Sequence, residues 1–112
     1  MVGENMTLNE LCQAFHVSRR AVQGYEQHGL LKPSSRNEKG HLLYNKAAQE
    51  KVRQIKQYQD FGFTVRQISA LFESPAPVLK QQLLRQRERL LADQVKLNET
   101  ICLITALIEK IG

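Results

Sequence analysis

The sequence has little of several residue types, and each shortage excludes a class of protein. Its 112 residues contain no tryptophan, two cysteines and three prolines. Cysteines as far apart as Cys12 and Cys102 do not form the disulfide framework of a small secreted domain. No apolar run approaches the roughly 18 residues that a membrane span needs. The first nine residues lack a basic segment followed by an apolar one, so we expect no signal peptide, no membrane partner and a cytoplasmic protein.

Patterns of catalytic and metal-binding residues are also lacking, so we do not expect an enzyme. The sequence shows no Ser-His-Asp set, no paired carboxylates in a recognisable pocket and no glycine-rich phosphate loop. Cys12 and His16 stand four residues apart, a spacing that can hold a metal, but Cys12 continues an apolar stripe and a third ligand is not evident. Cys102 has apolar neighbours, which favours packing over a redox role. We therefore expect no metal and no cofactor.

Positive charge is present, and it is concentrated in one segment. The net charge of the chain is +5, whereas residues 18–66 alone carry ten lysines and arginines against four acidic residues, a net charge of +6. Such a segment suggests a polyanionic partner, because neutralising phosphates releases counterions. A solvated basic surface explains the charge alone equally well.

Two short helices separated by a tight turn are predicted near the N-terminus. Thr7 to Glu10 is a capping box, which begins a helix with an apolar stripe that includes Leu11. After a turn at residues 16–17, Ser18 is a good N-cap for a second helix, which ends at Gly29. The apolar side of the second helix consists of Ala21, Val22 and Tyr25. This arrangement predicts a helix-turn-helix.

The segment after the second helix is typical of a wing. Leu30–Pro33 and His41–Tyr44 are short apolar runs on either side of a polar loop, which predicts a hairpin. The loop carries Arg36 and Lys39. A basic hairpin directly after a helix-turn-helix can lie along a phosphate backbone or reach a minor groove.

Two more helices complete the predicted N-terminal domain, which we call the head. Asn45 caps a third helix over residues 46–61, and Gly62 ends it. Thr64 to Gln67 is a second capping box, which opens a fourth helix. The core face of the third helix is predicted to contain Val52, Ile55, Tyr58 and Phe61.

The prolines at positions 75 and 77 interrupt the helical pattern and divide the chain. We therefore expect residues 1–74 to form a winged helix-turn-helix DNA-binding domain. Residues 75–112 are expected to form a linker and a dimerisation helix.

The C-terminal part predicts one long helix, from about Val78 to Ile111, with an apolar residue at every seventh position. It would be roughly 50 Å long at 1.5 Å per residue, so one head cannot cover its stripe. A two-stranded coiled coil between subunits explains the pattern better than a helix folded back on its own head. The predicted dimer seam comprises Leu83, Leu90, Leu97, Ile101, Ile104, Ile108 and Ile111.

In their order and spacing these parts resemble the MerR family of bacterial transcription regulators. Residues 17–30 match the family's valine-serine helix start, Tyr-Glu pair and Gly-Leu stop. Residues 36–44 match its wing, and residues 61–64 match the turn before its second wing. The resemblance implies a mainly α fold: a winged helix-turn-helix head with a small β-hairpin, followed by a long helix that forms an antiparallel coiled-coil dimer.

The resemblance also implies a function. Each head would place its second helix in a major groove, and the dimer would bind a pseudo-palindromic promoter site and distort it. The implied partners are double-stranded DNA, a second copy of the chain and RNA polymerase at the promoter. The implied DNA-binding residues are Ser18, Arg19, Arg20, Gln23, Tyr25, Arg36, Lys39, Tyr44, Thr64 and Arg66.

The chain departs from the family pattern at two places. Members usually read Arg-Tyr-Tyr-Glu where this chain has residues 23–26, and Tyr-Arg where it has His41 and Leu42. Two expected DNA-contacting arginines are therefore missing, although Gln23 could still read adenine through a bidentate pair. Gly24 costs about 1 kcal/mol relative to alanine inside a helix. Close approach of the backbone to DNA or to the wing would explain that glycine, and drift in a divergent member is the alternative.

These departures keep a second hypothesis open. A MerR-like protein-interaction module, for example a chaperone-cofactor modulator, would not need the missing arginines. The Arg19–Arg20 pair, the +6 segment and the basic wing favour DNA. Members of the family usually carry an effector part after the long helix.

Overall fold

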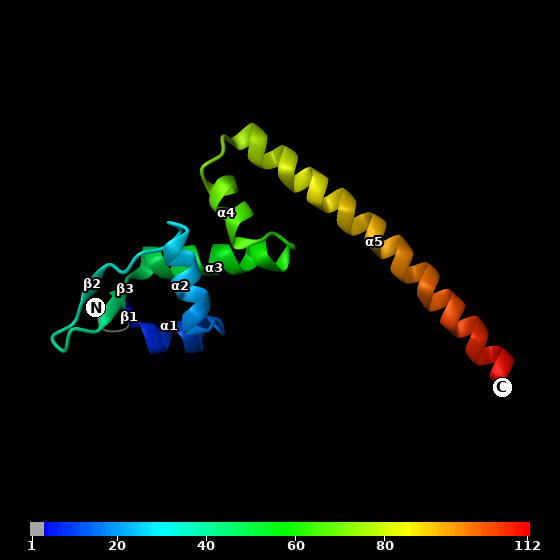
Figure 1. Cartoon of the computed structure of the whole chain (residues 1–112), viewed down its shortest axis with the longest axis horizontal. Helices are drawn as coiled ribbons and strands as arrows, with labels where there is room; N and C mark the ends of the chain where they lie inside the picture. The colour runs from blue at the N-terminus through cyan, green and yellow to red at the C-terminus, as the bar shows by residue number, and fades with distance from the viewer. Residues whose placement is uncertain (1–3) are drawn as a thin grey trace. The chain divides into compact units, whose positions relative to one another are not determined.

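A computed structural model describes residues 4–112 and divides the chain into two compact units (Figure 1). The first unit, the head, ends at Glu73, and the second runs from Ser74 to Gly112. The fold is mainly helical, with a small antiparallel sheet in the head. Within residues 4–112, no helix combines the length and the hydropathy that crossing a membrane requires.

Four helices of the head carry most of its structure. They are α1 (Leu8–Phe15), α2 (Arg19–Gln27), α3 (Lys46–Asp60) and α4 (Val65–Phe72). Each begins at a side chain that accepts a backbone N–H of the first turn. Ser18 accepts from the N–H of Ala21 at 3.0 Å and Asn45 from that of Ala48 at 2.9 Å. These caps confirm the predicted helix starts, because a cap depends only on neighbouring residues.

Both predicted capping boxes are formed. The carboxylate of Glu10 accepts the backbone N–H of Thr7 at 2.9 Å, and the threonine hydroxyl accepts the N–H of Glu10 in return. Thr64 and Gln67 repeat this exchange at the start of α4. Each box satisfies two backbone donors that a helix start would otherwise leave unpaired.

The sheet differs from the predicted hairpin. Its strands are β1 (Met6–Thr7), β2 (Ser35–Arg36) and β3 (Leu42–Tyr44), in the order β1-β3-β2. The prediction that Leu30–Pro33 forms the first strand of the hairpin was wrong, because Leu30 and Leu31 turn into the core instead and Pro33 has no N–H to pair. The β1 strand was not predicted, and it pairs Met6 with Tyr44.

The core of the head joins all of its helices. Residues at 0–1% exposure are Leu11, Val22, Tyr25, Tyr44, Val52, Ile55 and Ile68. The ring of Tyr58 on α3 stands edge-on to Phe72 of α4, with the ring centroids 5.2 Å apart. Tyr58 and Phe61 are half-buried, so the predicted core face of α3 is buried at its middle and thins toward its end.

The second unit is the single helix α5 (Ala76–Ile111), 36 residues long and about 54 Å at 1.5 Å per residue. It begins two residues before the predicted start at Val78. Pro77 lies in its first turn, where a missing N–H costs no hydrogen bond. The proline therefore starts the helix instead of delaying it.

Candidate nucleic-acid interface

The turn between α1 and α2 is held in place from α3. His16 adopts a left-handed conformation with φ of 55°, and Val17 donates its N–H to the carbonyl of Cys12 at 3.1 Å. The ammonium of Lys56 donates to the carbonyls of Phe15 and His16. Lys56 therefore stabilises the turn of the helix-turn-helix, and it holds the start of α2 in place relative to α3.

The first turn of α2 presents a basic surface. Arg19, Arg20 and Gln23 are exposed, and within residues 4–112 the side chains of Arg20 and Gln23 have no hydrogen bond or ion pair. No acidic residue stands in this turn. Cations interact unfavourably with the positive end of a helix dipole, so the two arginines lower the stability of α2. They also make the electrostatic potential at the start of the helix more positive. The two exposed arginines at this helix N-terminus form a surface suited to an anion.

The two tyrosines expected at the DNA lie in the core instead. Tyr25 is 1% exposed and donates its hydroxyl to Gln59 at 2.8 Å, while Tyr44 is 1% exposed and donates to Glu26 at 2.9 Å. Burial raises the pKa of Tyr25, and burial together with the bond to Glu26 raises the pKa of Tyr44, so both remain donors. Neither has the free surface that a DNA contact requires. Their role is to attach α2 to α3 and β3.

Gly24 faces open space. A Cβ built there would meet no atom within 4 Å. Close approach of the wing, which was one explanation for this glycine, is therefore wrong. Approach of DNA and drift remain as explanations.

The wing is a tight turn stabilised by its own polar groups. The Asn37 side-chain oxygen accepts the N–H groups of Lys39 and His41, both at 3.0 Å. The Arg36 guanidinium donates to the carbonyl of Gly40 at 2.6 Å, and Gly40 has the positive φ of 81° that the turn requires. The ammonium of Lys39 has no partner among residues 4–112. The wing thus offers one restrained and one free cation.

The predicted residues of the second wing lie at the start of α4, with Thr64 as its N-cap. The Thr64 hydroxyl oxygen is occupied by the cap of α4, and Arg66 is exposed in the first turn. The hydroxyl of Ser69 donates to the carbonyl of His28 at 3.0 Å, which ties α4 to the end of α2. Neither Thr64 nor Arg66 lines the hollow described next.

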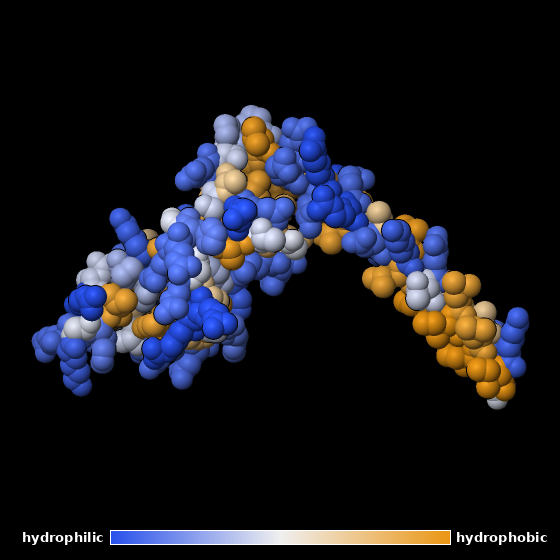
Figure 2. All heavy atoms as spheres, viewed as in Figure 1, coloured by the Kyte–Doolittle hydropathy of each residue, from blue (hydrophilic) through white to orange (hydrophobic). Residues whose placement is uncertain are grey.

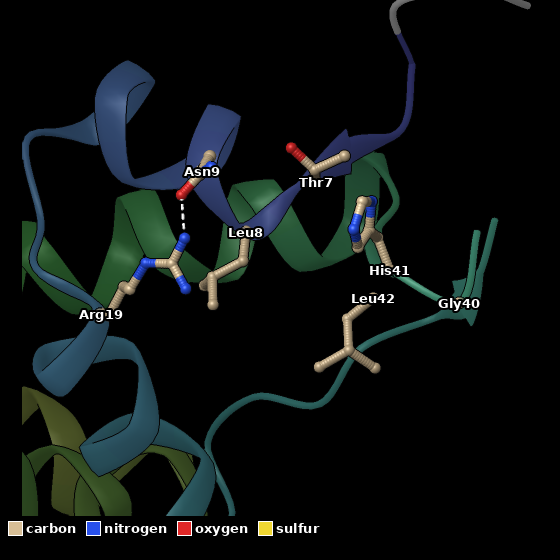
Figure 3. A pocket seen from close by; sticks show the side chains of 7 residues that line it. All are labelled: Thr7, Leu8, Asn9, Arg19, Gly40, His41 and Leu42. Carbon is tan, nitrogen blue, oxygen red and sulfur yellow. Dashed lines mark hydrogen bonds between the residues drawn. The ribbon is translucent and has the colours of Figure 1, made fainter.

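A hollow between α1, α2 and the wing brings together residues that the sequence kept apart (Figure 3). Arg19 and the wing residues His41 and Leu42 line it, together with Leu8 and Asn9 of α1. The Arg19 guanidinium donates a hydrogen bond to the side-chain oxygen of Asn9. Asn9 was not predicted as a site residue, because ten positions of sequence separate it from Arg19.

The α5 helix carries the large apolar residues that are exposed in the described part of the chain. There are twelve of them, from Val78 at 44% exposure to Ile111 at 86%. Figure 2 shows apolar surface gathered toward the C-terminal end of α5. The predicted seam residues fall on one face by their spacing of three, four and seven. Leu83 is half-buried, and the other six are exposed, among them Leu97 at 62% and Ile108 at 61%. An apolar stripe of this length on an exposed helix indicates a partner surface.

The cysteines and histidines form no metal-binding cluster in the described part of the chain. No group of three histidine, cysteine, aspartate or glutamate side chains within residues 4–112 is arranged to hold a metal ion. Cys12 is half-buried in the apolar stripe of α1, and Cys102 is exposed on α5.

The head has the arrangement of a winged helix-turn-helix, and comparison with known proteins gives its family. The family model for the MerR HTH family regulatory proteins matches residues 6–74. The chain therefore belongs to the MerR family, and its head is the helix-turn-helix domain that the family model describes.

Individual relatives agree with this assignment. The chain is 36% identical over 83 residues to the transcriptional activator TipA of Streptomyces coelicolor, which covers 74% of this chain and 33% of TipA. The chain thus spans about a third of that relative's length. The crystal structure of a MerR family regulator from Bacillus cereus superposes with a TM-score of 0.71 at 30% identity, covering 87% of this chain and 75% of that one.

A third similarity concerns the fold alone. HiNmlR, a MerR family regulator lacking the sensor domain and solved bound to promoter DNA, matches with a TM-score of 0.65 at 13% identity. The match covers 93% of this chain and 87% of HiNmlR. TipA is named as a transcriptional activator, and the Bacillus cereus protein as a transcriptional regulator.

Proposed function

We propose that the chain is a sequence-specific transcription regulator that binds a pseudo-palindromic promoter site as a homodimer and distorts it. The observation that carries the proposal is the start of α2, where two arginines of the first turn and the following Gln23 are exposed on a helix-turn-helix of the MerR family. Phosphate contacts from the arginines would set the register, and Gln23 would read a base edge.

The α5 helix supports the dimeric part of the proposal. Its seam would be buried between two copies in an antiparallel coiled coil, with one head at each end. A symmetric dimer presents two equivalent reading helices, so its site is an inverted repeat. Bending or untwisting the duplex between the half-sites would change the alignment of promoter elements for RNA polymerase.

Selection of bound sequences from random DNA tests this proposal. The wild-type chain should enrich one inverted repeat, and Gln23→Ala should relax the preference at one position in each half-site while costing roughly 1–3 kcal/mol. Lys96→Ala on α5 serves as the control and should enrich the same repeat. If the wild type enriches no sequence at near-physiological salt, the regulator hypothesis fails.

A protein-interaction module is the second candidate, and one observation favours it. Gln23 and Leu42 stand where the family usually carries DNA-contacting arginines. A module of this type would bind a protein partner through the exposed faces of α5 and would bind DNA only non-specifically. The same selection distinguishes the two candidates, because only the regulator enriches a sequence.

A further inference from the structure

The hollow beside Arg19 has two kinds of surface (Figure 3). Leu8 and Leu42 are half-buried and supply apolar contact area from α1 and from the wing. Arg19 supplies a full positive charge from the first turn of α2. An apolar floor beside one fixed cation matches the backbone of DNA, in which each charged phosphate is attached to a largely apolar deoxyribose ring.

The hydrogen bond from Arg19 to Asn9 gives this hollow its geometry. An arginine side chain loses about 2 kcal/mol of rotamer entropy when it is held in one position, and a prior hydrogen bond reduces what a ligand must still order. Asn9 uses one of the five N–H donors of the guanidinium. The remaining donors stay available for bidentate contact with phosphate oxygens.

The chemistry of Asn9 suits this role. An amide oxygen holds the guanidinium without cancelling its charge, whereas a carboxylate at the same position would neutralise it. Asn9 is exposed in the first turn of α1, where an acidic residue would be favoured by the helix dipole. The neutral residue therefore keeps the potential of Arg19 at some cost to the stability of α1.

We propose that the hollow is a subsite for one deoxyribose-phosphate unit of the DNA backbone, with Arg19 on the phosphate, Leu8 and Leu42 against the sugar, and Asn9 as the residue that positions Arg19. The subsite rests on the proposed function and adds to it a role for Asn9. It also explains how the wing can keep a phosphate beside it with leucine at position 42, because the cation comes from α2 on the other side of the hollow.

Three variants on the selected inverted repeat test the subsite, with affinity measured over a range of salt concentration. Arg19→Ala should weaken binding about tenfold per head and flatten the log–log salt slope by about 0.9 per head. Asn9→Asp should do nearly the same, because the new carboxylate pairs with Arg19. Asn9→Ala should weaken binding less and keep the slope, because Arg19 remains charged and loses only its restraint.

Thermal unfolding separates positioning from structural damage. Asn9→Asp should melt at the wild-type temperature or above it, because an acidic residue in the first turn stabilises α1. Loss of DNA binding by a variant of undiminished stability is the result that a merely structural role of Asn9 would not give. Gln57→Glu adds the same charge to an exposed position of α3 that does not line the hollow, and it should leave the affinity and the slope as in the wild type.

The outcomes are distinct for the subsite and for the proposed function. If the wild type binds its repeat and both Asn9→Asp and Arg19→Ala bind with unchanged affinity and slope, the subsite is wrong and the regulator stands. If Gln57→Glu weakens binding as much as Asn9→Asp, general charge repulsion explains the loss and the subsite is wrong. If the wild type itself binds without preference, the proposed function fails and the subsite fails with it.

Discussion

At the scale of single residues, the buried tyrosine hydroxyls of the head have hydrogen-bond partners, whereas two of its exposed cations have none. Tyr25 and Tyr44 each have a hydrogen-bond partner in the core, whereas Arg20 and Lys39 have none within residues 4–112. An unpaired buried hydroxyl costs on the order of 1–3 kcal/mol, while an exposed cation is solvated and costs little. These two cations can therefore bind an external anion without breaking any hydrogen bond within the head.

Tyr25 also illustrates what residue patterns predict. The apolar side of α2 predicted that Tyr25 faces the core, whereas the resemblance implied that it faces DNA. The structure agrees with the apolar pattern, because the ring is 1% exposed. The partner of its hydroxyl, Gln59, lies 34 residues away on α3, so no local pattern predicts that bond.

Replacing Gly24 with alanine should stabilise the head. The new Cβ meets no atom within 4 Å, and alanine in a helix interior is favoured over glycine by about 1 kcal/mol. Urea unfolding of the two proteins measures the difference, and a decrease in stability would contradict the open environment of this position. The DNA affinity of Gly24→Ala then decides between the two explanations that remain: a loss indicates close approach of DNA, and an unchanged affinity indicates drift.

Replacing Arg20 with glutamate should separate stability from binding. An acidic residue in the first turn of α2 interacts favourably with the helix dipole, so the free energy of unfolding should rise by about 0.3–1 kcal/mol at low salt. DNA binding should be lost, because a phosphate contact becomes a repulsion. Calorimetry and a binding titration measure the two effects.

Arg20→Gln is the matched control for this experiment. It removes the phosphate contact without adding repulsion, so it should bind more tightly than Arg20→Glu and less tightly than the wild type. Should Arg20→Glu bind DNA as well as the wild type, Arg20 has no place in the interface.

At the scale of elements, the helix starts were predicted correctly, whereas the pairing of the strands was not. The caps at Thr7, Ser18, Asn45 and Thr64 all form as predicted, because each depends on residues within three positions. The sheet depends on contacts between distant segments, and there the predicted strand at 30–33 was wrong. Two leucines that could pair in a strand are used in the core, and the short β2 pairs with β3 across the polar turn at Asn37 instead.

Lys39, the wing cation without a partner, should contribute equally to the affinity for every DNA sequence. Lys39→Ala should weaken binding to specific and random DNA by similar factors, and it should flatten the salt slope by about one unit for each phosphate that the lysine neutralises. The turn of the wing should persist, because it uses the backbone N–H of Lys39 and not its ammonium. Fluorescence anisotropy at several salt concentrations measures the slope.

Lys96→Ala on α5 is the control for the wing variant. It removes the same charge from an exposed position outside the head and should leave the slope unchanged. A change at Lys39→Ala that is confined to one sequence would instead assign this lysine to base reading.

At the scale of the whole molecule, α5 should associate two chains. The double substitution Leu90→Asp and Leu97→Asp should give a monomer, because buried unpaired carboxylates are costly. Its head should remain folded, because the buried apolar residues all belong to the head. Sedimentation measures the mass, and circular dichroism measures the helix content, which should fall as α5 loses its partner.

Val95→Asp is the matched control for the dimer. Val95 is 56% exposed and lies off the seam by its position in the repeat, so the charge should leave the dimer intact. A wild-type chain that sediments as a monomer at micromolar concentration would contradict the coiled coil. Equal dissociation of both variants would contradict the assigned seam.

The uncovered stripe of α5 has a consequence for how a cell would set the activity of this protein. If only the paired chain occupies a promoter, then below the dissociation constant of the pair the amount of paired chain varies with the square of the amount of free chain. Halving synthesis would then leave about a quarter of the paired chain. Gene dosage and the rate of degradation would then control the amount of paired chain. The concentration at which this control acts is the dissociation constant of the pair, which the apolar residues of α5 determine.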